Sequence, residues 1–152
     1  MKRRKPAQLT PPEPNRNVEF IVLGEPIPQG SMKGFPIRRG NGAIGVSLTS
    51  ANTKMKPWRQ EVALTAIQKW NAPPSDKPIK LALTFILTRK KTVTRTFPTV
   101  KPDIDKMTRA IMDALTGVVY YDDGQVVMVV AEKQYAFSVP SQVVIRVLEY
   151  SP

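Results

Sequence analysis

The chain has 152 residues, 41% of them hydrophobic, and its 23 Lys and Arg against 12 Asp and Glu give a net charge of +11. It contains no cysteine and no histidine, which excludes disulfides, thiolate nucleophiles, imidazole metal ligands and triads that depend on histidine. The charge predicts a polyanionic partner, with nucleic acid first, anionic membrane second and an acidic protein third.

The N-terminal residues 1–16 are basic and rich in proline, and they predict a disordered arm. No apolar segment of a secretory signal follows the basic start, and no apolar run is long enough to span a bilayer. We therefore expect no membrane partner and a cytoplasmic location. Residues 17–152 contain no repeat and no internal boundary, which indicates one domain.

The first half of this domain predicts a strand at VEFIVLG (18–24), because the run is apolar and β-branched. Residues 25–45 are rich in Gly and Pro and predict a long loop, and VSLTS (46–50) predicts a short strand. Apolar residues recur every three to four positions in KPWRQEVALTAIQKW (56–70), which indicates a helix.

The second half begins with IKLALTFIL (79–87), where alternation predicts a strand with Leu81, Leu83, Phe85 and Leu87 on one face. A basic loop follows, then a helix over about 104–116, a hairpin of strands 118–121 and 125–136, and a last strand at 142–150. This order predicts an α/β fold of α+β-like type: a single small domain with a mixed, mostly antiparallel sheet packed with two main helices.

Five of the acids fall within residues 101–124, at Asp103, Asp105, Asp113, Asp122 and Asp123. In extended chain, residues two apart point to the same side, so Asp103 and Asp105 would converge on one ion only if the helix began at or just after Asp105. The alternative is that one of them caps the helix.

The remaining acids also have two interpretations. Asp105, Arg109 and Asp113 recur every four residues, which predicts either an exposed ion-pair ladder or a phosphate contact by Arg109 beside a metal-binding aspartate. Asp122 and Asp123 either serve a turn or add one carboxylate to the site, because adjacent residues point in opposite directions.

If the turn folds back beside the helix N-terminus, three or four aspartates meet, and a divalent cation would relieve their repulsion. Oxygen ligands favour Mg²⁺, with Mn²⁺ as a substitute. Clustered acids in a basic chain are the electrostatic arrangement of a nuclease. The basic surface binds DNA phosphates, and a metal ion in the acidic pocket helps to cleave one phosphodiester bond.

The run KPDIDKMTRAIMDALTGVVYYDDGQVVMVVAEKQY (101–135) resembles the RusA family of Holliday-junction resolvases, common in phages and prophages. The family's core reads K-P-D-x-D-N-x-x-K-x-x-x-D-A-L-x-G, then a short strand, D-D-x-Q-V, a Lys and an aromatic. FIVLGEPIPQGS (20–31) and KMKPWRQEV (54–62) are similar to its opening strand and loop and to its first helix.

This resemblance implies a homodimeric, Mg²⁺-dependent endonuclease of a bacterial or phage-infected cell, which binds four-way DNA junctions and nicks two strands symmetrically. By position, Asp103, Asp105 and Asp123 match the family's essential metal-binding acids, and Asp122 matches the acid beside the last of them. Arg109 stands where the family usually has a catalytic Lys, and Lys106 stands where it usually has Asn.

The candidate DNA-binding residues are basic side chains that would contact phosphates: Lys33, Arg38, Arg39, Arg89, Lys90, Lys91, Arg95, Lys101 and Lys106. One alternative function is a basic nucleic-acid-binding module without catalysis, in which every aspartate is a cap, a turn residue or an ion-pair partner. The other is a protein-interaction domain with VVMVV (126–130) as an edge, although this run is more typical of a buried strand.

Overall fold

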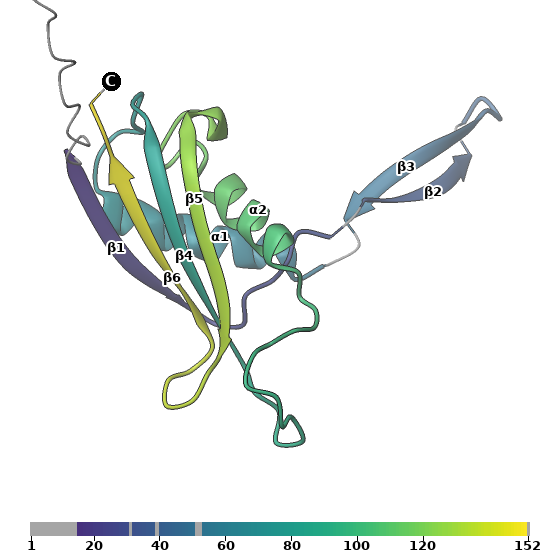
Figure 1. Cartoon of the computed structure of the whole chain (residues 1–152). Helices are drawn as coiled ribbons and strands as arrows, with labels where there is room; N and C mark the ends of the chain where they lie inside the picture. The colour runs from purple at the N-terminus through teal and green to yellow at the C-terminus, as the bar shows by residue number, and fades with distance from the viewer. Residues whose placement is uncertain (1–14, 31, 39, 51–52, 152) are drawn as a thin grey trace, which may run out of the picture.

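A computed structural model describes residues 15–30, 32–38, 40–50 and 53–151. Two helices cover one face of a four-stranded sheet, and a two-stranded hairpin extends away to one side (Figure 1). The elements in chain order are β1 (Arg16–Leu23), β2 (Met32–Arg38), β3 (Ile44–Ser50), α1 (Met55–Trp70), β4 (Ile79–Leu87), α2 (Ile104–Leu115), η1 (Asp123–Gln125), β5 (Val126–Tyr135) and β6 (Gln142–Glu149).

The main sheet has the strand order β1-β6-β4-β5. β6 pairs antiparallel with β1 and β4, whereas β4 and β5 pair in parallel. A parallel pair needs a long crossover, and here the crossover contains α2, which runs opposite to β5 (Figure 1). The predicted fold class, with its mixed, mostly antiparallel sheet and two helices, is confirmed.

The hydrophobic core lies between this sheet and the two helices. The predicted alternation of β4 is confirmed, because Leu81, Leu83, Phe85 and Leu87 are all buried. The helices bury one stripe each against these strands, made of Trp58, Val62, Ala66 and Trp70 from α1 and of Met107, Ile111, Ala114 and Leu115 from α2.

The predicted hairpin is wrong because residues 118–121 form no strand, whereas the predicted strand 125–136 is confirmed as β5. After α2 the chain turns at Gly117, whose φ of 79° suits glycine, and the buried Tyr120 makes only isolated bridges. The one-turn 3₁₀ helix η1 stands where the Asp-Gly turn was expected, and β5 continues from it to pair with β4. The local sequence is typical of a hairpin, but the predicted second strand pairs in parallel with β4 instead.

β5 is an edge strand, so the expectation that VVMVV is a buried strand is also wrong. The side chains of Val127, Met128 and Val130 are 64%, 50% and 59% exposed. An apolar edge of this kind presents unpaired backbone groups and apolar surface together. The loop expected over residues 25–45 is likewise wrong in part, because β2 lies within it and pairs with β3.

β1 starts at Arg16, the last residue of the predicted arm, whose guanidinium lies 4.0 Å from the centre of the Trp70 ring. The backbone N–H of Asn15 donates to the carbonyl oxygen of Glu149 at 2.7 Å. The rest of the predicted arm lies outside the described residues. Within the described ranges, no helix combines the length and the apolar character needed to cross a membrane.

Packing of α2 on the sheet predicts a large effect of truncating Ile111, which is fully buried. We expect Ile111→Ala to lower the free energy of unfolding by about 2–5 kcal/mol, through lost burial and a residual cavity. The matched control is Ile67→Ala on the outer face of α1, where the side chain is 55% exposed. Urea denaturation measures both, and equal effects of the two variants would contradict this packing.

Candidate functional site

Asp103 occupies the N-cap position of α2, in extended backbone with ψ of 136°, but its side chain makes no capping hydrogen bond. Instead, the Lys106 Nζ donates to its Oδ2 at 3.2 Å. Both residues line a pocket of about 610 Å³ together with Lys101 and the loop residues Pro28–Gly30. Asp103 therefore stands at the cap position without serving as a cap.

Asp105 lies in the first turn of α2 and faces a different pocket, of about 500 Å³. Asp103 is still in extended backbone at the N-cap whereas Asp105 is already helical, so the two acids are not the fully extended pair that was predicted. Arg109 and Asp123 line this second pocket with Asp105, beside apolar side chains of α2 and β5. The candidate metal-binding acids Asp103, Asp105 and Asp123 thus divide between two pockets.

The adjacent acids Asp122 and Asp123 have different tasks. The Oδ1 of Asp122 accepts a hydrogen bond from the backbone N–H of Gly124 at 2.8 Å and so caps η1. Asp123 is exposed and lines the pocket that holds Asp105 and Arg109. Asp122 therefore serves the local structure, and Asp123 is the acid of the pair that faces the pocket.

Gln125 fixes this acidic turn with both ends of its side-chain amide. Its Oε1 accepts from the backbone N–H groups of Tyr121 and Asp122, each at 3.0 Å. Its Nε2 donates to the carbonyl oxygens of Ser75 and Lys77, at 2.8 and 3.0 Å. Gln125 is not among the residues predicted from the sequence, although Asp122 and Gln125 have the spacing of a capping box.

Two further contacts outside the sequence prediction hold the segment in front of α2. The Lys133 Nζ on β5 donates to the carbonyl oxygens of Val100 and Pro102, at 2.8 and 3.0 Å. The backbone N–H of Gln29, in the loop after β1, donates to the carbonyl oxygen of Lys106 at 3.0 Å. The first turn of α2 is therefore braced from β5 on one side and from the loop on the other.

Tyr120 links the acidic turn to the C-terminal part of α2, because its hydroxyl donates to the carbonyl oxygen of Met112 at 2.9 Å. Burial raises the pKa of this phenol well above its usual range, and the carboxylates of Asp123 and Asp113 raise it further. The phenol consequently stays protonated at neutral pH, so it is a structural donor and not a base.

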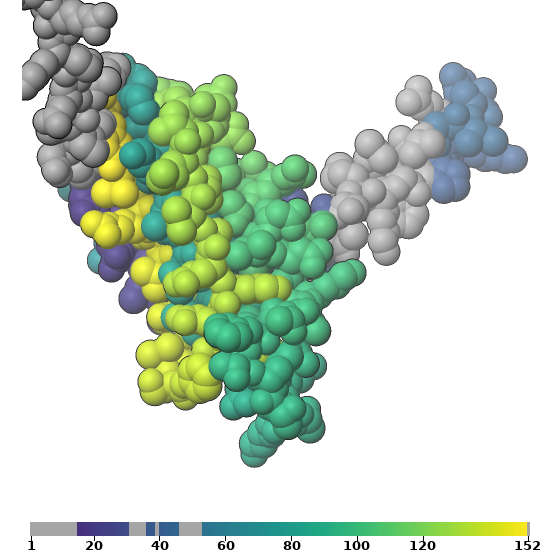
Figure 2. Space-filling view, in the orientation of Figure 1, coloured from purple at the N-terminus to yellow at the C-terminus, as the bar shows by residue number. Residues whose placement is uncertain are grey.

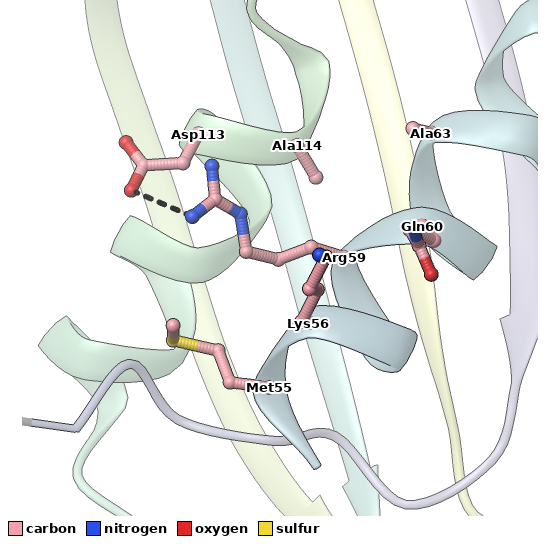
Figure 3. Close-up of a pocket in the computed structure, with 7 residues that line it drawn as sticks. All are labelled: Met55, Lys56, Arg59, Gln60, Ala63, Asp113 and Ala114. Carbon is pink, nitrogen blue, oxygen red and sulfur yellow. Dashed lines mark ion pairs between the residues drawn. The ribbon is translucent and has the colours of Figure 1, made fainter. Parts of the chain in front are cut away.

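The predicted ladder of Asp105, Arg109 and Asp113 does not form. Asp113 pairs with Arg59 of α1 instead, with 3.8 Å between Oδ2 and Nη1, and Figure 3 shows the two side chains meeting in the groove between the helices. Among the ion pairs of the described ranges, none contains Arg109. Its guanidinium faces the pocket of Asp105 and Asp123 and is available to an anion there.

A single copy does not gather the acids into one metal site. Across the described part of the chain, no three acidic, His or Cys side chains are grouped so that they could hold a metal ion. α2 is about 18 Å long at 1.5 Å per residue, with Asp103 at its start, whereas Asp123 lies near its other end, beside Tyr120. The assignment of Asp103, Asp105 and Asp123 as metal-binding acids stays a prediction.

The basic loop 88–101 projects from the end of the sheet where α2 begins (Figures 1 and 2). Two of its arginines are held by aromatic residues: Arg95 Nε donates to the Tyr135 hydroxyl at 2.9 Å, and the Arg89 guanidinium lies 5.9 Å from the Phe137 ring centre. Of the other candidates, Lys90, Lys91, Lys101 and Arg38 are exposed, Lys106 pairs with Asp103, and Arg39 and the Lys33 side chain lie outside the described residues.

Comparison with known proteins gives two matches. Residues 26–147 match the family model described as "Endodeoxyribonuclease RusA". The chain is also 30% identical over 141 residues to a protein of Bacillus subtilis (strain 168) with the name "Uncharacterized protein YqaN", and the alignment covers 85% of this chain and 95% of that protein. The family match contains every described residue assigned to the two pockets above.

The Gln125 contacts predict that Gln125→Leu loosens the acidic turn. We expect the free energy of unfolding to fall by about 1–3 kcal/mol, because backbone groups at a partly buried site lose their partners. The amides of Tyr121 and Asp122 should lose hydrogen-exchange protection. The control is Gln134→Leu, at an exposed position of β5. Unchanged hydrogen-exchange protection in Gln125→Leu would contradict the role of Gln125 in holding the acidic turn.

Proposed function

The chain belongs to the RusA endodeoxyribonuclease family, and from this premise we propose that it is a Mg²⁺-dependent nuclease that resolves four-way DNA junctions by paired, symmetric nicks. The observation that carries the proposal is that Asp105, Arg109 and Asp123 line one pocket, beside a strongly basic loop. Carboxylates that attract a cation and a guanidinium that attracts a phosphate belong together in phosphodiester hydrolysis. We place this activity in the cytoplasm of a bacterial or phage-infected cell.

The position of Asp103 and Asp123 near opposite ends of α2 supports a site made by two copies of the chain. β5 is a free, apolar edge, and two such edges can pair antiparallel about a two-fold axis. β5 starts three residues after Asp123, whereas its end lies beside the segment leading to α2, where Lys133 holds Val100 and Pro102. Antiparallel pairing therefore brings Asp123 of a second copy toward Asp103 and Asp105 of the first.

The donor set fits the proposed metal in chemistry, since Mg²⁺ takes oxygen ligands and commonly uses one or two carboxylates with water and substrate phosphates. We propose that Asp103 and Asp105 of one copy and Asp123 of the other hold it, with Mn²⁺ as a substitute. A divalent ion supplies an activated water and stabilises charge at phosphorus when bound.

The other side chains bind and orient the DNA. The guanidinium of Arg109 can donate to phosphate oxygens in a fixed fork, which suits charge stabilisation. The exposed Lys and Arg side chains of the loop 88–101 would contact phosphates without reading the DNA sequence. A two-fold junction then presents equivalent strands to two equivalent sites, which is the physical reason for paired nicks.

The non-catalytic alternative explains part of the acidic segment, because Asp103, Asp113 and Asp122 each have a structural partner. It gives no task to Asp105 and Asp123, which both face the pocket of Arg109. A cleavage assay decides between the two functions.

Asp105→Asn and Asp123→Asn should each reduce Mg²⁺-dependent cutting of a labelled four-way junction by at least about a hundredfold, since even partners outside a metal's direct ligands cost up to that much. Junction binding should persist, because it depends on phosphate contacts. Asp76→Asn, on an exposed loop, is the control. Absence of cutting by the unmodified chain with Mg²⁺ or Mn²⁺ would favour the non-catalytic module.

The shared site predicts recovery when inactive variants are combined. An equal, co-refolded mixture of Asp103→Asn and Asp123→Asn should recover about a quarter of the wild-type nicking, because half of the dimers are mixed and each has one intact site. A mixture of Asp103→Asn with Asp105→Asn should recover none, since these residues come from the same copy. Equal behaviour of the two mixtures would exclude the shared site without affecting the proposed activity.

A further inference from the structure

The β2–β3 hairpin is the largest feature that the proposed reaction leaves without a task. β2 and β3 pair only with each other, and the hairpin stands clear of the four-stranded sheet (Figure 1). An isolated two-stranded hairpin has little stability of its own in water. A projecting hairpin of this kind would therefore gain stability from a contact outside the domain.

The root of the hairpin is attached to the acid-bearing end of α2. The loop that leads into β2 supplies Pro28, Gln29 and Gly30 to the pocket of Asp103. Within it, the backbone N–H of Gln29 donates to the carbonyl oxygen of Lys106 at 3.0 Å. β2 begins three residues after Gln29, so the root of the hairpin lies near the first turn of α2.

The end of the ribbon exposes apolar side chains on both faces. Arg38 is opposite Ile44 and Ile37 is opposite Gly45, so Ile37 and Ile44 lie on opposite faces, because adjacent strand residues alternate. Ile37 is 42% exposed and Ile44 is 76% exposed. Among the described side chains of the hairpin these two isoleucines are exposed, and both would gain by burial against an external apolar surface.

The charge of the ribbon identifies the class of that surface. Residues 32–50 contain Lys33, Arg38 and Arg39 and no acid, which favours a polyanion. The only extended apolar surfaces of a polyanionic nucleic acid are the faces of its bases, and these are accessible where stacking is interrupted. Exposed isoleucines beside an exposed arginine thus match the bases and phosphates at a break in stacking.

We propose that the β2–β3 hairpin is a wedge that enters the branch point of DNA, with Ile37 and Ile44 packed against the base pairs on its two sides and Arg38 on a phosphate. The inference rests on the proposed function for the branched substrate. An intact duplex arm would have to be unstacked first, at a cost of a few kcal/mol per step, whereas a branch point is already interrupted. The hairpin would thus select branched DNA by its shape and not by its sequence.

The test uses the full chain in EDTA, so that DNA is bound and not cut, and a four-way junction with 2-aminopurine beside the branch point or within one arm. We expect binding to increase the fluorescence at the branch and not in the arm. The double variant Ile37→Ser with Ile44→Ser should lose most of this increase. Its preference for junction over duplex should fall about tenfold, equivalent to about 1.4 kcal/mol, because affinity for duplex depends on phosphate contacts.

The matched control is Leu64→Ser with Ile67→Ser, since these α1 side chains are also exposed, by 57% and 55%. It should keep both the fluorescence increase and the junction preference. The wedge is excluded if the unmodified chain binds without the increase or fails to bind, or if the double variant behaves as the control does. A chain that opens the branch but does not cut with Mg²⁺ would overturn the proposed nuclease and leave the wedge in place.

Discussion

The parallel pairing of β4 with β5 determines where every candidate site residue lies. A parallel pair requires a crossover, and the crossover here is the basic loop, α2 and the acidic turn. Since α2 must run back along the sheet, it places Asp103 at one end of β5 and Asp123 at the other. The same pairing leaves the outer edge of β5 unpaired. The separated acids and the free edge are thus two results of one constraint.

The acidic residues themselves are held by a small number of polar contacts. Gln125 uses its amide to fix the turn of Asp122 and Asp123 on the loop before β4. Lys133 does the same for the segment before Asp103. In both cases the partners are backbone groups. The pocket of Asp105 and Asp123 is lined by Arg109 as its basic side chain and by no lysine. Preorganised acids of this kind are suited to a cation that binds with the substrate.

Family membership and geometry contribute differently to the functional conclusion. The match over residues 26–147 assigns the chain to an endodeoxyribonuclease family. The structure adds that Asp123, not Asp122, faces Arg109, and that Asp113 belongs to an ion pair between the helices. The proposed dimer, its shared metal site and the hairpin wedge follow from exposed edges and unpaired side chains of the domain.

The sequence by itself determined the helices, strands β1, β4 and β6 and the core face of β4, because their apolar spacing matches one period of secondary structure. It also determined the set of residues available for chemistry, since a chain without His or Cys has only oxygen ligands to offer. Only the tertiary structure decided that VVMVV is an edge, that residues 118–121 are not a strand and that Asp103 and Asp123 lie near opposite ends of α2. The physical reason is that strand pairing joins residues distant in the chain, and local propensity contains no information on which partner a strand will take.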